Sequence, residues 1–558
     1  MKKMLISMLV VCSMVLVLTA CGGNKTESNT PNTQGQSTSG DEMVDGRFTE
    51  TRTITVEIYD RGNDGGSDPT DNMYTDYIKE NMLEMYNIAV EFVPVPRWTE
   101  VDAINNLLAA GDAPFICYTY DYPTIKTYAG MGGVLDLSGY LEEYSDMLPN
   151  LWDLLTDGNI YWNEDPVTGE LWAIEARLAV SNRVTTFVRA DWLNALGLDE
   201  PTTKQEFEEM LQAFKENAEL LLGSDAGKLI PYSVGADVGW RAMTLIESFM
   251  DPQMSDREFF IKGFDERRIT QDGTKEAVAL LNKWYNDGLL WNDFALYGDG
   301  DTTEEDMMKA GYIGAFTHNW DQPYRNGEDS IEANLKRLVG EEASYIVVDC
   351  FEDRNGDYTK FVPGPIDRKI FFPTTNTEPL ASLLYLDFIS TDTTIEYLQM
   401  GDEGVTHNVL NSEDGDIIEI IAGEGTAIQN STFNIDYTMT SNGLKFVDAE
   451  KTLRSRAYSY ANVDAALVER ANEVANTNLR IGKNVNVGEI VAEEGVGSAL
   501  SEKRNIIYVT SVVAAPEAFD SVWDNGMADY LSSGGKAIME EREVKWIASY
   551  GDVDQLPE

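Results

Sequence analysis

The sequence predicts an α/β protein that folds into two or more lobes, and three observations support this prediction. From about residue 50 to about residue 390, segments with the alternating pattern of strands are interleaved with segments that have helical spacing. The ~500 residues that follow residue 50 are more than one hydrophobic core usually serves. After the first twenty residues, no apolar segment of the sequence is long enough to cross a membrane.

The N-terminus predicts a lipoprotein signal peptide over residues 1–20. Lys2 and Lys3 precede an apolar run from Met4 to Leu18, and Leu18-Thr19-Ala20-Cys21 then resembles the lipobox of bacterial lipoproteins. This resemblance implies cleavage before Cys21 and lipidation of its sulfur, with two acyl chains that anchor stably where one would be marginal. The alternative is an ordinary secretory signal followed by a chance cysteine.

Residues 21–49 are expected to form a lipidated, flexible tether. They are rich in Gly, Ser, Thr, Asn and Gln, and they have no apolar periodicity. A flexible chain of this length reaches roughly 30 Å. The folded part is therefore expected on the extracellular face of the cell membrane, held there by the lipid anchor.

The chain is strongly acidic, with a formal charge of −53. Such a surface repels nucleic acid and anionic membranes, and it disfavours polyanionic ligands unless local arginines overcome the field. Solubility outside the cell is the simplest explanation for the charge. Beyond the signal and the lipobox only Cys117 and Cys350 remain, both in apolar, strand-like runs. We expect them to be buried free thiols, and a disulfide between them stays open.

The first elements can be placed in order along the chain. Thr53–Asp60 alternates apolar and polar residues and predicts a strand, which runs into a glycine-rich loop over Arg61–Asn72. Thr99–Asp102 has the pattern of a capping box and predicts the start of a helix that Gly111 ends. A short apolar segment follows at Phe115–Tyr118.

Later elements follow the same rules. Thr203–Glu206 is a second capping-box pattern, and apolar residues from Phe207 to Phe214 recur at helical spacing. Gly311–Phe316 is small and apolar, as in a buried strand. From about residue 450 the chain is expected to be mainly helical, and Pro516–Leu531 predicts one of these helices.

The common catalytic and metal-binding motifs are missing from the sequence. There are only two histidines, and there is no HExxH, GxSxG or CxxC motif. Asp353–Asp357 lacks the glycine of a calcium loop and predicts a hairpin turn, although calcium there or at residues 60–72 stays open. We therefore expect no catalytic residue, no metal and no cofactor. Because a glycosidase needs only two carboxylates, the 95 acidic residues leave an enzyme as the alternative class.

Aromatic residues in polar, turn-rich contexts indicate a carbohydrate site. A pyranose ring has a face of C–H groups and a rim of hydroxyls. Aromatic rings bury the face, and Asp, Asn, Gln and Arg satisfy the rim with hydrogen bonds. A packing role in the core is the alternative for each aromatic residue. The residues in question are Trp98, Tyr120, Tyr122, Trp240, Trp320 and Tyr324.

Five segments carry a family resemblance, in the same order along the chain as in the family. They are Asn163–Ala173 (NEDPVTGELWA), Val188–Thr203 (VRADWLNALGLDEPTT), Ala310–Tyr324, Glu378–Phe388 and Gly401–His407 (GDEGVTH). With the lipobox, they resemble the family 1 extracellular solute-binding lipoproteins of bacterial carbohydrate ABC importers. The proline that is usual in the first of these segments is absent here.

The resemblance implies a two-lobed, type II periplasmic-binding-protein-like fold. In this fold a hinge that the chain crosses more than once joins two α/β lobes, and the ligand binds in the cleft between them. By analogy, the first lobe takes residues 50–182 and 366–445, and the second lobe takes residues 183–365 and 446–558.

The same resemblance implies the ligand-binding residues. The strand Gly311–Phe316 would end at the cleft, with His318–Tyr324 as a ligand-facing wall in which Trp320 stacks and His318 is a neutral hydrogen-bonding group. The arginines suit a uronate, but neutral sugars also use arginine, so the charge of the ligand stays open. The implied residues are Arg61, Asn63, Asp64, Trp98, Tyr120, Asp121, Tyr122, Arg177, Arg183, Trp240, His318, Trp320, Asp321 and Tyr324.

The resemblance thus predicts a receptor rather than an enzyme. A monomer anchored through Cys21, in a Gram-positive cell, would bind an oligosaccharide or related sugar and deliver it to the permease subunits of an ABC transporter. No nucleic acid partner is expected. Three alternatives stay open: a non-sugar ligand such as a peptide, a secreted polysaccharide-degrading enzyme, and a sensor subunit that presents its ligand to a membrane receptor.

Overall fold

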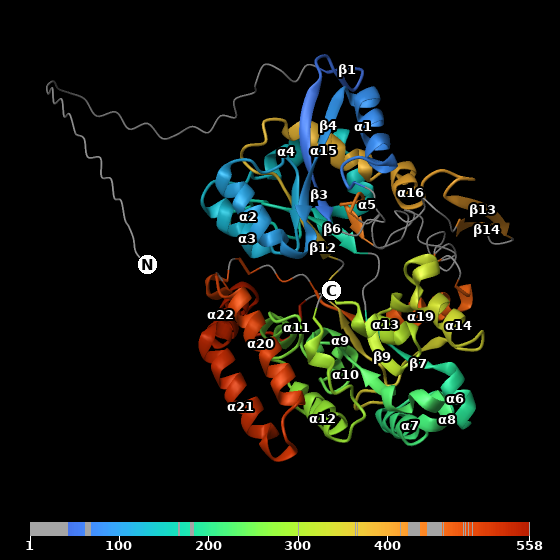
Figure 1. Ribbon diagram of the computed structural model, residues 1–558. Coiled ribbons are helices and arrows are strands. Elements are labelled where there is room, and N and C mark those ends of the chain that lie inside the picture. The colour runs from blue at the N-terminus through green and yellow to red at the C-terminus, as the bar shows by residue number, and fades with distance from the viewer. Residues whose placement is uncertain are drawn as a thin grey trace, which may run out of the picture.

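The computed structural model has two lobes, one above the other (Figure 1). Cys21, Asn63, Asp64 and Arg183 lie outside the residues that it describes. The described residues are 43–61, 68–165, 168–178, 184–298, 301–362, 364, 366–412, 415–421, 436–442, 460, 463–483, 485, 487–488, 490–493 and 495–556.

The first lobe, at the top of Figure 1, is built around one parallel pair of strands and one mixed sheet. β3 (Arg52–Asp60) pairs in parallel with β4 (Ile88–Pro96), which confirms the strand predicted at Thr53–Asp60. A parallel bridge from Val56 to Ile116 connects β3 to a second sheet of order β15-β6-β12-β5. The strands of this second sheet are β5 (Cys117–Thr119), β6 (Ile174–Leu178), β12 (Ile366–Phe371) and β15 (Ser441–Asn442).

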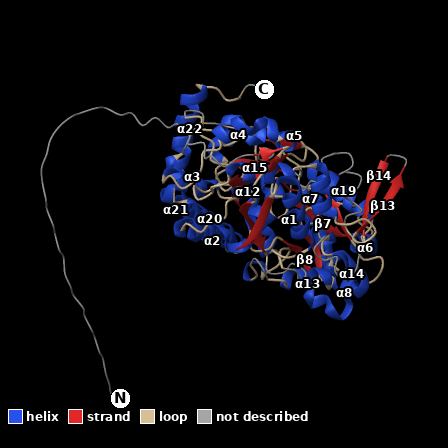
Figure 2. Ribbon diagram, turned by 90° about the horizontal axis from the view of Figure 1, so that it is seen from above, coloured by secondary structure: helices blue, strands red, loops and turns tan. Residues whose placement is uncertain are grey.

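Seven helices of the described part surround these strands: α1 (Met73–Tyr86), α2 (Glu100–Ala110), α3 (Tyr122–Gly130), α4 (Ser138–Tyr144), α5 (Pro149–Ile160), α15 (Pro379–Ile389) and α16 (Asp392–Met400). Two small hairpins complete the lobe. One pairs β1 (Met43–Val44) with β2 (Arg47–Phe48), and the other pairs β13 (His407–Ser412) with β14 (Gly415–Ile420). The second hairpin projects from one edge of the molecule (Figure 2).

The second lobe contains a four-stranded sheet of order β10-β7-β9-β8. Its strands are β7 (Val184–Arg189), β8 (Ile230–Ser233), β9 (Ile313–Asn319) and β10 (Tyr345–Val348). β9 is the strand predicted at Gly311–Phe316, but it continues to Asn319 because Thr317–Asn319 stay paired with Val184–Thr186 of β7. The segment that was expected to leave the sheet after Phe316 is therefore partly strand.

The helices of the second lobe are α6 (Ala190–Leu196), α7 (Lys204–Glu216), α8 (Ala218–Leu222), α9 (Val238–Arg241), α10 (Met243–Glu247), α11 (Asp256–Lys262), α12 (Thr274–Asn286), α13 (Thr303–Lys309), α14 (Ile331–Leu338), α19 (Ala465–Asn476), α20 (Gly497–Val512), α21 (Phe519–Tyr530) and α22 (Lys536–Tyr550). The last four agree with the prediction of a mainly helical C-terminal region. β11 (Lys360–Val362) pairs in parallel with β16 (Leu479–Ile481).

The two predicted capping boxes have different outcomes. At α7 the hydroxyl of Thr203 accepts the N–H of Glu206, and the Glu206 carboxylate accepts the N–H of Thr203, which confirms the motif. At α2 the prediction was wrong, because the Thr99 side chain makes no capping bond. A 3₁₀ turn over Arg97–Thr99 runs directly into α2, so Thr99 does not have the extended backbone of a capping residue.

Each lobe has a hydrophobic core of its own. One core draws on residues from Phe48 to Met439, and the other on residues from Phe187 to Ile538. Cys117 and Cys350 are buried free thiols, as expected, and they do not form the disulfide that stayed open. The structure thus confirms an α/β fold of two lobes, while the residue limits given for each lobe stay a prediction. None of the described helices is long and apolar enough to cross a membrane.

Candidate functional site

A pocket of about 350 Å³ lies between the lobes, where α3 of the first lobe faces α22 of the second (Figure 1). The first lobe contributes the start of α3 and the segment that follows α5. The second lobe contributes α11, α22 and the segment that follows β16. The lining residues are Tyr122, Pro123, Lys126, Thr127, Trp162, Asn163, Glu164, Asp165, Trp172, Phe260, Val485, Val487, Gly488, Ile490, Glu493 and Arg542.

Aromatic side chains from both lobes line this pocket. Tyr122, Trp162 and Trp172 belong to the first lobe and Phe260 to the second, and all four are partly buried. The hydroxyl of Tyr122 donates a hydrogen bond to the carbonyl of Asn163 at 3.2 Å, which fixes one wall. Aromatic surface on both sides of a cleft suits the apolar faces of sugar rings.

Arg542 organises the second-lobe wall. Its Nε donates to Glu493 at 2.6 Å, and its Nη1 donates to the carbonyl of Phe260 at 2.7 Å. The guanidinium also lies over the ring of Phe260, with its carbon 4.7 Å from the ring centroid. These contacts hold the polar group in one position beside the apolar ring.

Beneath the first-lobe wall lies Glu175, which is 0% exposed. Asn163, a pocket residue, donates to its Oε1 at 3.1 Å, and Lys369 of β12 lies 3.6 Å away. Burial raises the pKa of Glu175 to about 7, although the charge of Lys369 opposes the rise. A carboxyl group with a pKa near neutrality therefore lies next to the pocket without lining it.

The structure brings together Arg61, Trp98 and Tyr120, three residues that the sequence predicted from separate segments. Arg97 joins them: its guanidinium carbon lies 4.6 Å from the ring centroid of Tyr120 and 5.6 Å from that of Trp98. Arg61 lies 6.0 Å from the centroid of Trp98. Trp98 is 71% exposed, so most of its surface is open to a ligand.

Asp436 holds Arg61 in place by a bidentate ion pair, with distances of 2.6 and 2.9 Å. The two residues are 375 positions apart in the sequence. Asp436 also lies 4.0 Å from the fully buried Arg368. The sequence reasoning did not find Asp436, because no local pattern marks a partner so far along the chain.

On the second lobe, His318 lies in β9 and is partly buried. Its Nδ1 accepts the backbone N–H of Asn319 at 2.8 Å, which leaves Nε2 as the donor of a neutral ring. Burial and the nearby charges of Arg241 and Arg325 hold the pKa of His318 well below its usual value. These contacts support the neutral state that was expected for this histidine.

Asp321 is buried and already has two partners. It pairs with Arg325 at 2.5 Å and accepts the hydroxyl of Tyr460 at 2.8 Å. Arg325 in turn lies close enough to Arg61 of the first lobe for their charges to interact. The pairs Arg61–Asp436 and Arg325–Asp321 therefore face each other from the two lobes.

Two residues that the sequence predicts as ligand contacts, Trp320 and Tyr324, are buried in the second lobe. Tyr324 is 0% exposed and contacts Phe187 edge-on at 6.1 Å between ring centroids. Trp320 is 7% exposed and packs edge-on against Tyr460 at 6.1 Å. β9 continues to Asn319, so Trp320 and Tyr324 lie in the short segment directly after the strand. Both rings pack against the second-lobe core. The stacking role expected of Trp320 has little exposed surface to act through.

The other predicted residues are dispersed. Asp121 accepts the Thr124 hydroxyl at 2.6 Å in the first turn of α3. Trp240 lies under Arg267, whose guanidinium carbon is 4.9 Å from the indole centroid. Arg177 donates to the carbonyl of Leu154 at 3.3 Å, inside the first lobe.

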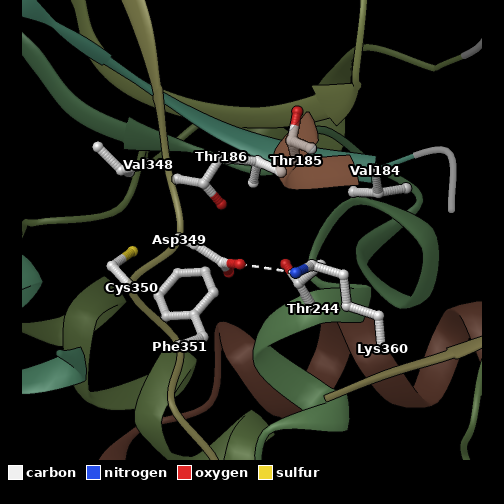
Figure 3. A pocket seen from close by; sticks show the side chains of 10 residues that line it. Val184, Thr185, Thr186, Thr244, Val348, Asp349, Cys350, Phe351 and Lys360 are labelled. Atoms are coloured by element: carbon white, nitrogen blue, oxygen red, sulfur yellow. Dashed lines mark hydrogen bonds and ion pairs between the residues drawn. The ribbon is translucent and has the colours of Figure 1, made fainter. Parts of the chain in front are cut away.

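A second cavity, of about 10 Å³, lies within the second lobe (Figure 3). Asp349 and Lys360 form an ion pair of 2.6 Å beside it, and Thr185 and Thr244 also line it. This volume is that of about one water molecule, so the cavity is too small for a sugar. Within the described ranges, no three His, Cys, Asp or Glu side chains are arranged to hold a metal ion.

Several lining residues were missed at the sequence level, although a signal existed for two of them. Trp162 and Trp172 lie beside and within the segment Asn163–Ala173, which carried part of the family resemblance. Phe260 and Arg542 had no such signal, since they lie on helices whose exposed faces look ordinary in sequence.

Comparisons with known proteins agree with this architecture. The family described as bacterial extracellular solute-binding protein matches residues 77–339. Lipoprotein LipO of Bacillus subtilis is 29% identical over 225 residues, which are 38% of this chain and 41% of LipO. The polygalacturonan/rhamnogalacturonan-binding protein YtcQ of B. subtilis is 22% identical over 337 residues, which are 59% of this chain and 63% of YtcQ. The chain thus matches less than two thirds of the length of either relative.

Solved structures share the fold at low sequence identity. The alginate-binding protein AlgQ2 superposes with a TM-score of 0.64 at 13% identity, covering 89% of this chain and 98% of AlgQ2. FusA of S. pneumoniae, solved in complex with kestose, gives 0.60 at 12% identity, covering 90% of this chain and 100% of FusA. Both are two-lobed substrate-binding proteins, so the chain has the fold of periplasmic solute-binding proteins. Residues 77–339 thus match the family of bacterial extracellular solute-binding proteins, and the chain shares the two-lobed fold of these solved relatives.

Proposed function

We propose that the chain is the lipid-anchored receptor of a carbohydrate ABC importer, which binds an oligosaccharide between its lobes and delivers it to the permease. The observation that carries this proposal is the interlobe pocket of about 350 Å³, with aromatic rings on both lobes and fixed polar groups beside them. A pocket of this size and composition is typical of small-ligand sites.

A chain of several sugars suits the site better than a single sugar. Tyr120 belongs to the cluster with Arg97 and Trp98, and Tyr122, two residues later, lines the pocket. A glycan that passes this turn would contact the exposed Trp98 at one end and the pocket at the other. YtcQ and FusA, which are named or solved with polymeric or oligomeric sugars, support the same ligand class.

Binding without chemical conversion follows from the same picture. The family and its structural relatives are binding proteins, and closure of two lobes on a ligand needs no covalent step. The lipobox at Cys21 and the lipoprotein LipO support anchoring of the chain at the outer face of the cell membrane.

A thermal-shift panel of oligosaccharides and peptides tests the ligand class. A ligand at 100 times its dissociation constant adds about 2.7 kcal/mol to the free energy of unfolding, which raises Tm by a few degrees. We expect oligosaccharides to raise Tm and to be recovered intact. Stabilisation by peptides alone would overturn the ligand, and shortened glycan in the same samples would indicate an enzyme.

The anchor needs a separate test. Replacing the lipobox cysteine (Cys21→Ala) should abolish the incorporation of labelled fatty acid into the protein, because the sulfur that would carry the acyl chains is removed. Equal labelling of the variant and the unchanged protein would contradict lipidation at Cys21.

A further inference from the structure

We propose that the cleft selects a neutral glycan over a uronic-acid glycan. This inference rests on the proposed function, because it names the class of sugar that the same site takes. A uronate is usually recognised by an arginine that is available to its carboxylate. Near this cleft, however, four arginines of the described residues, Arg61, Arg97, Arg325 and Arg542, are already paired with carboxylates of the protein.

In the first lobe, two arginines are paired in this way. Asp436 takes both the Nε and the Nη2 of Arg61, at 2.6 and 2.9 Å, so the hydrogen-bonding edge that a uronate would use is occupied. Arg97 pairs with Glu100 through Nη1 alone, at 3.1 Å, and its Nε makes no hydrogen bond but is buried away from solvent. Both carboxylates are buried, and removing either from its arginine would leave an unpaired charge in a region of low dielectric.

The second lobe repeats the arrangement. Arg325, which faces Arg61, is paired with Asp321 at 2.5 Å, and Asp321 is held further by Tyr460. Arg542 at the pocket is paired with Glu493 at 2.6 Å. A uronate that entered between the lobes would place its carboxylate beside these protein carboxylates, and the repulsion would offset any attraction to the arginines.

The pocket itself carries more carboxylates than cations. Glu164 and Asp165 line it in addition to Glu493, whereas its lining cations are Lys126 and Arg542. The sequence adds no lysine or arginine between Val485 and Glu493, the stretch that supplies much of the second-lobe wall. Carboxylates accept hydrogen bonds from sugar hydroxyls, so this lining suits the rim of a neutral pyranose.

A competition capture experiment tests the selection. The purified protein is immobilised and incubated with a pool that contains neutral oligosaccharides, galacturonate oligosaccharides, and the same galacturonates with each carboxylate reduced to hydroxymethyl. The pool also contains peptides, and captured molecules are identified by mass spectrometry. We expect neutral and carboxyl-reduced glycans to be captured at least about tenfold more strongly than their uronate counterparts.

The outcomes separate this inference from the proposed function. Equal or preferential capture of uronates would overturn neutral selection and leave the carbohydrate receptor intact. Capture of no glycan, with or without peptide, would overturn the proposed function and this inference with it.

A charge-neutral variant sharpens the test. Glu493→Gln keeps the shape of the side chain and removes the negative charge beside Arg542, so uronate capture should rise by about tenfold over the unchanged protein. Glu540→Gln is the matched control. Glu540 lies on α22, the helix that carries Arg542, and it is exposed and pairs with Lys536 at 3.3 Å. Uronate capture by Glu493→Gln no higher than by the control, with Tm retained in both, would contradict the role of the Arg542–Glu493 pair.

Discussion

The indole ring of Trp162 lies so close to the backbone of Gly364 that a β-carbon at this glycine would be 2.3 Å from the Cη2 atom of the ring. Gly364 stands between β11, whose partner β16 belongs to the C-terminal part of the chain, and β12 of the first lobe. Trp162 also lines the interlobe pocket. The side chain of Trp162 therefore lines the pocket and also contacts Gly364, which lies between β11 and β12.

Gly364→Ala should weaken ligand binding, because the added methyl group must push Trp162 out of its present position. Overpacking of this kind costs about 1–3 kcal/mol of folding stability, and the displacement of Trp162 from the pocket should in addition lower the affinity by roughly tenfold. Isothermal titration calorimetry with the best oligosaccharide measures it. Gly227→Ala is the control, since nothing lies within 4 Å of a β-carbon there. Equal affinities for the two variants would show that the contact does not position Trp162 for the ligand.

Trp162→Ala should lower the affinity for an oligosaccharide by about 1–3 kcal/mol, through loss of the apolar area on which a sugar ring rests. Trp162→Phe should recover part of this loss because it keeps a smaller ring. If Trp162→Ala binds normally while Trp98→Ala does not, the ligand occupies the Trp98 cluster and not the pocket.

Trp320→Ala should destabilise the fold, by about 3–5 kcal/mol, because the ring is buried in the second-lobe core. Urea unfolding measures this change. Trp98→Ala, which removes a ring that is 71% exposed, should cost far less and serves as the control. Unchanged stability of Trp320→Ala together with lost affinity would instead restore the stacking role that the sequence suggested.

Glu175 should make stability fall as the pH rises. In the folded chain its pKa is raised to about 7, whereas in the unfolded chain it stays near 4.5, so the folded state binds the extra proton between these values. Over that window the wild-type protein should lose up to about 3 kcal/mol that Glu175→Gln does not lose. Denaturant titrations at several pH values measure the difference, with Glu91→Gln, an exposed site on β4, as control. Parallel stability curves for wild type and Glu175→Gln would contradict the raised pKa.

The imidazole of His318 should take up its proton well below the ordinary histidine pKa of about 6.5. The pKa of His318 in the folded chain is held well below that of the unfolded chain. The unfolded chain therefore binds the proton first, and the free energy of unfolding falls as the pH drops below about 6.5. Imidazole NMR resonances test this directly, because the sequence has only two histidines and His318→Gln identifies the signal. A midpoint near pH 6.5 for that signal would contradict the buried, neutral state.

Much of the fold could be predicted because its signals are local. The alternation in Thr53–Asp60 and the capping box at Thr203 involve residues within a few positions of each other, and both formed as predicted. The box at Thr99 did not form because a 3₁₀ turn over Arg97–Thr99 runs directly into α2, so Thr99 lacks the extended backbone that Thr203 has at its cap. The capping pattern does not report the conformation of the residues that precede it.

The site was harder to predict for the same reason. The cluster of Arg61, Trp98 and Tyr120 combines three predicted residues, but it depends on Arg97 and on the distant Asp436. Trp162 and Trp172 lay in and beside a recognised segment, yet no pattern showed which face of that segment meets the other lobe.

The sequence by itself determined the α/β class with two lobes and the resemblance to solute-binding proteins, and it predicts a lipoprotein leader, since each depends on order and periodicity along the chain. Only the tertiary structure decided which aromatic rings reach the cleft: it buried Trp320 and Tyr324, and it placed Trp162 on Gly364. Periodicity tells which residues share a face of a strand or helix. The residues that contact that face can lie hundreds of positions away in the sequence, as Asp436 does from Arg61, with which it forms an ion pair.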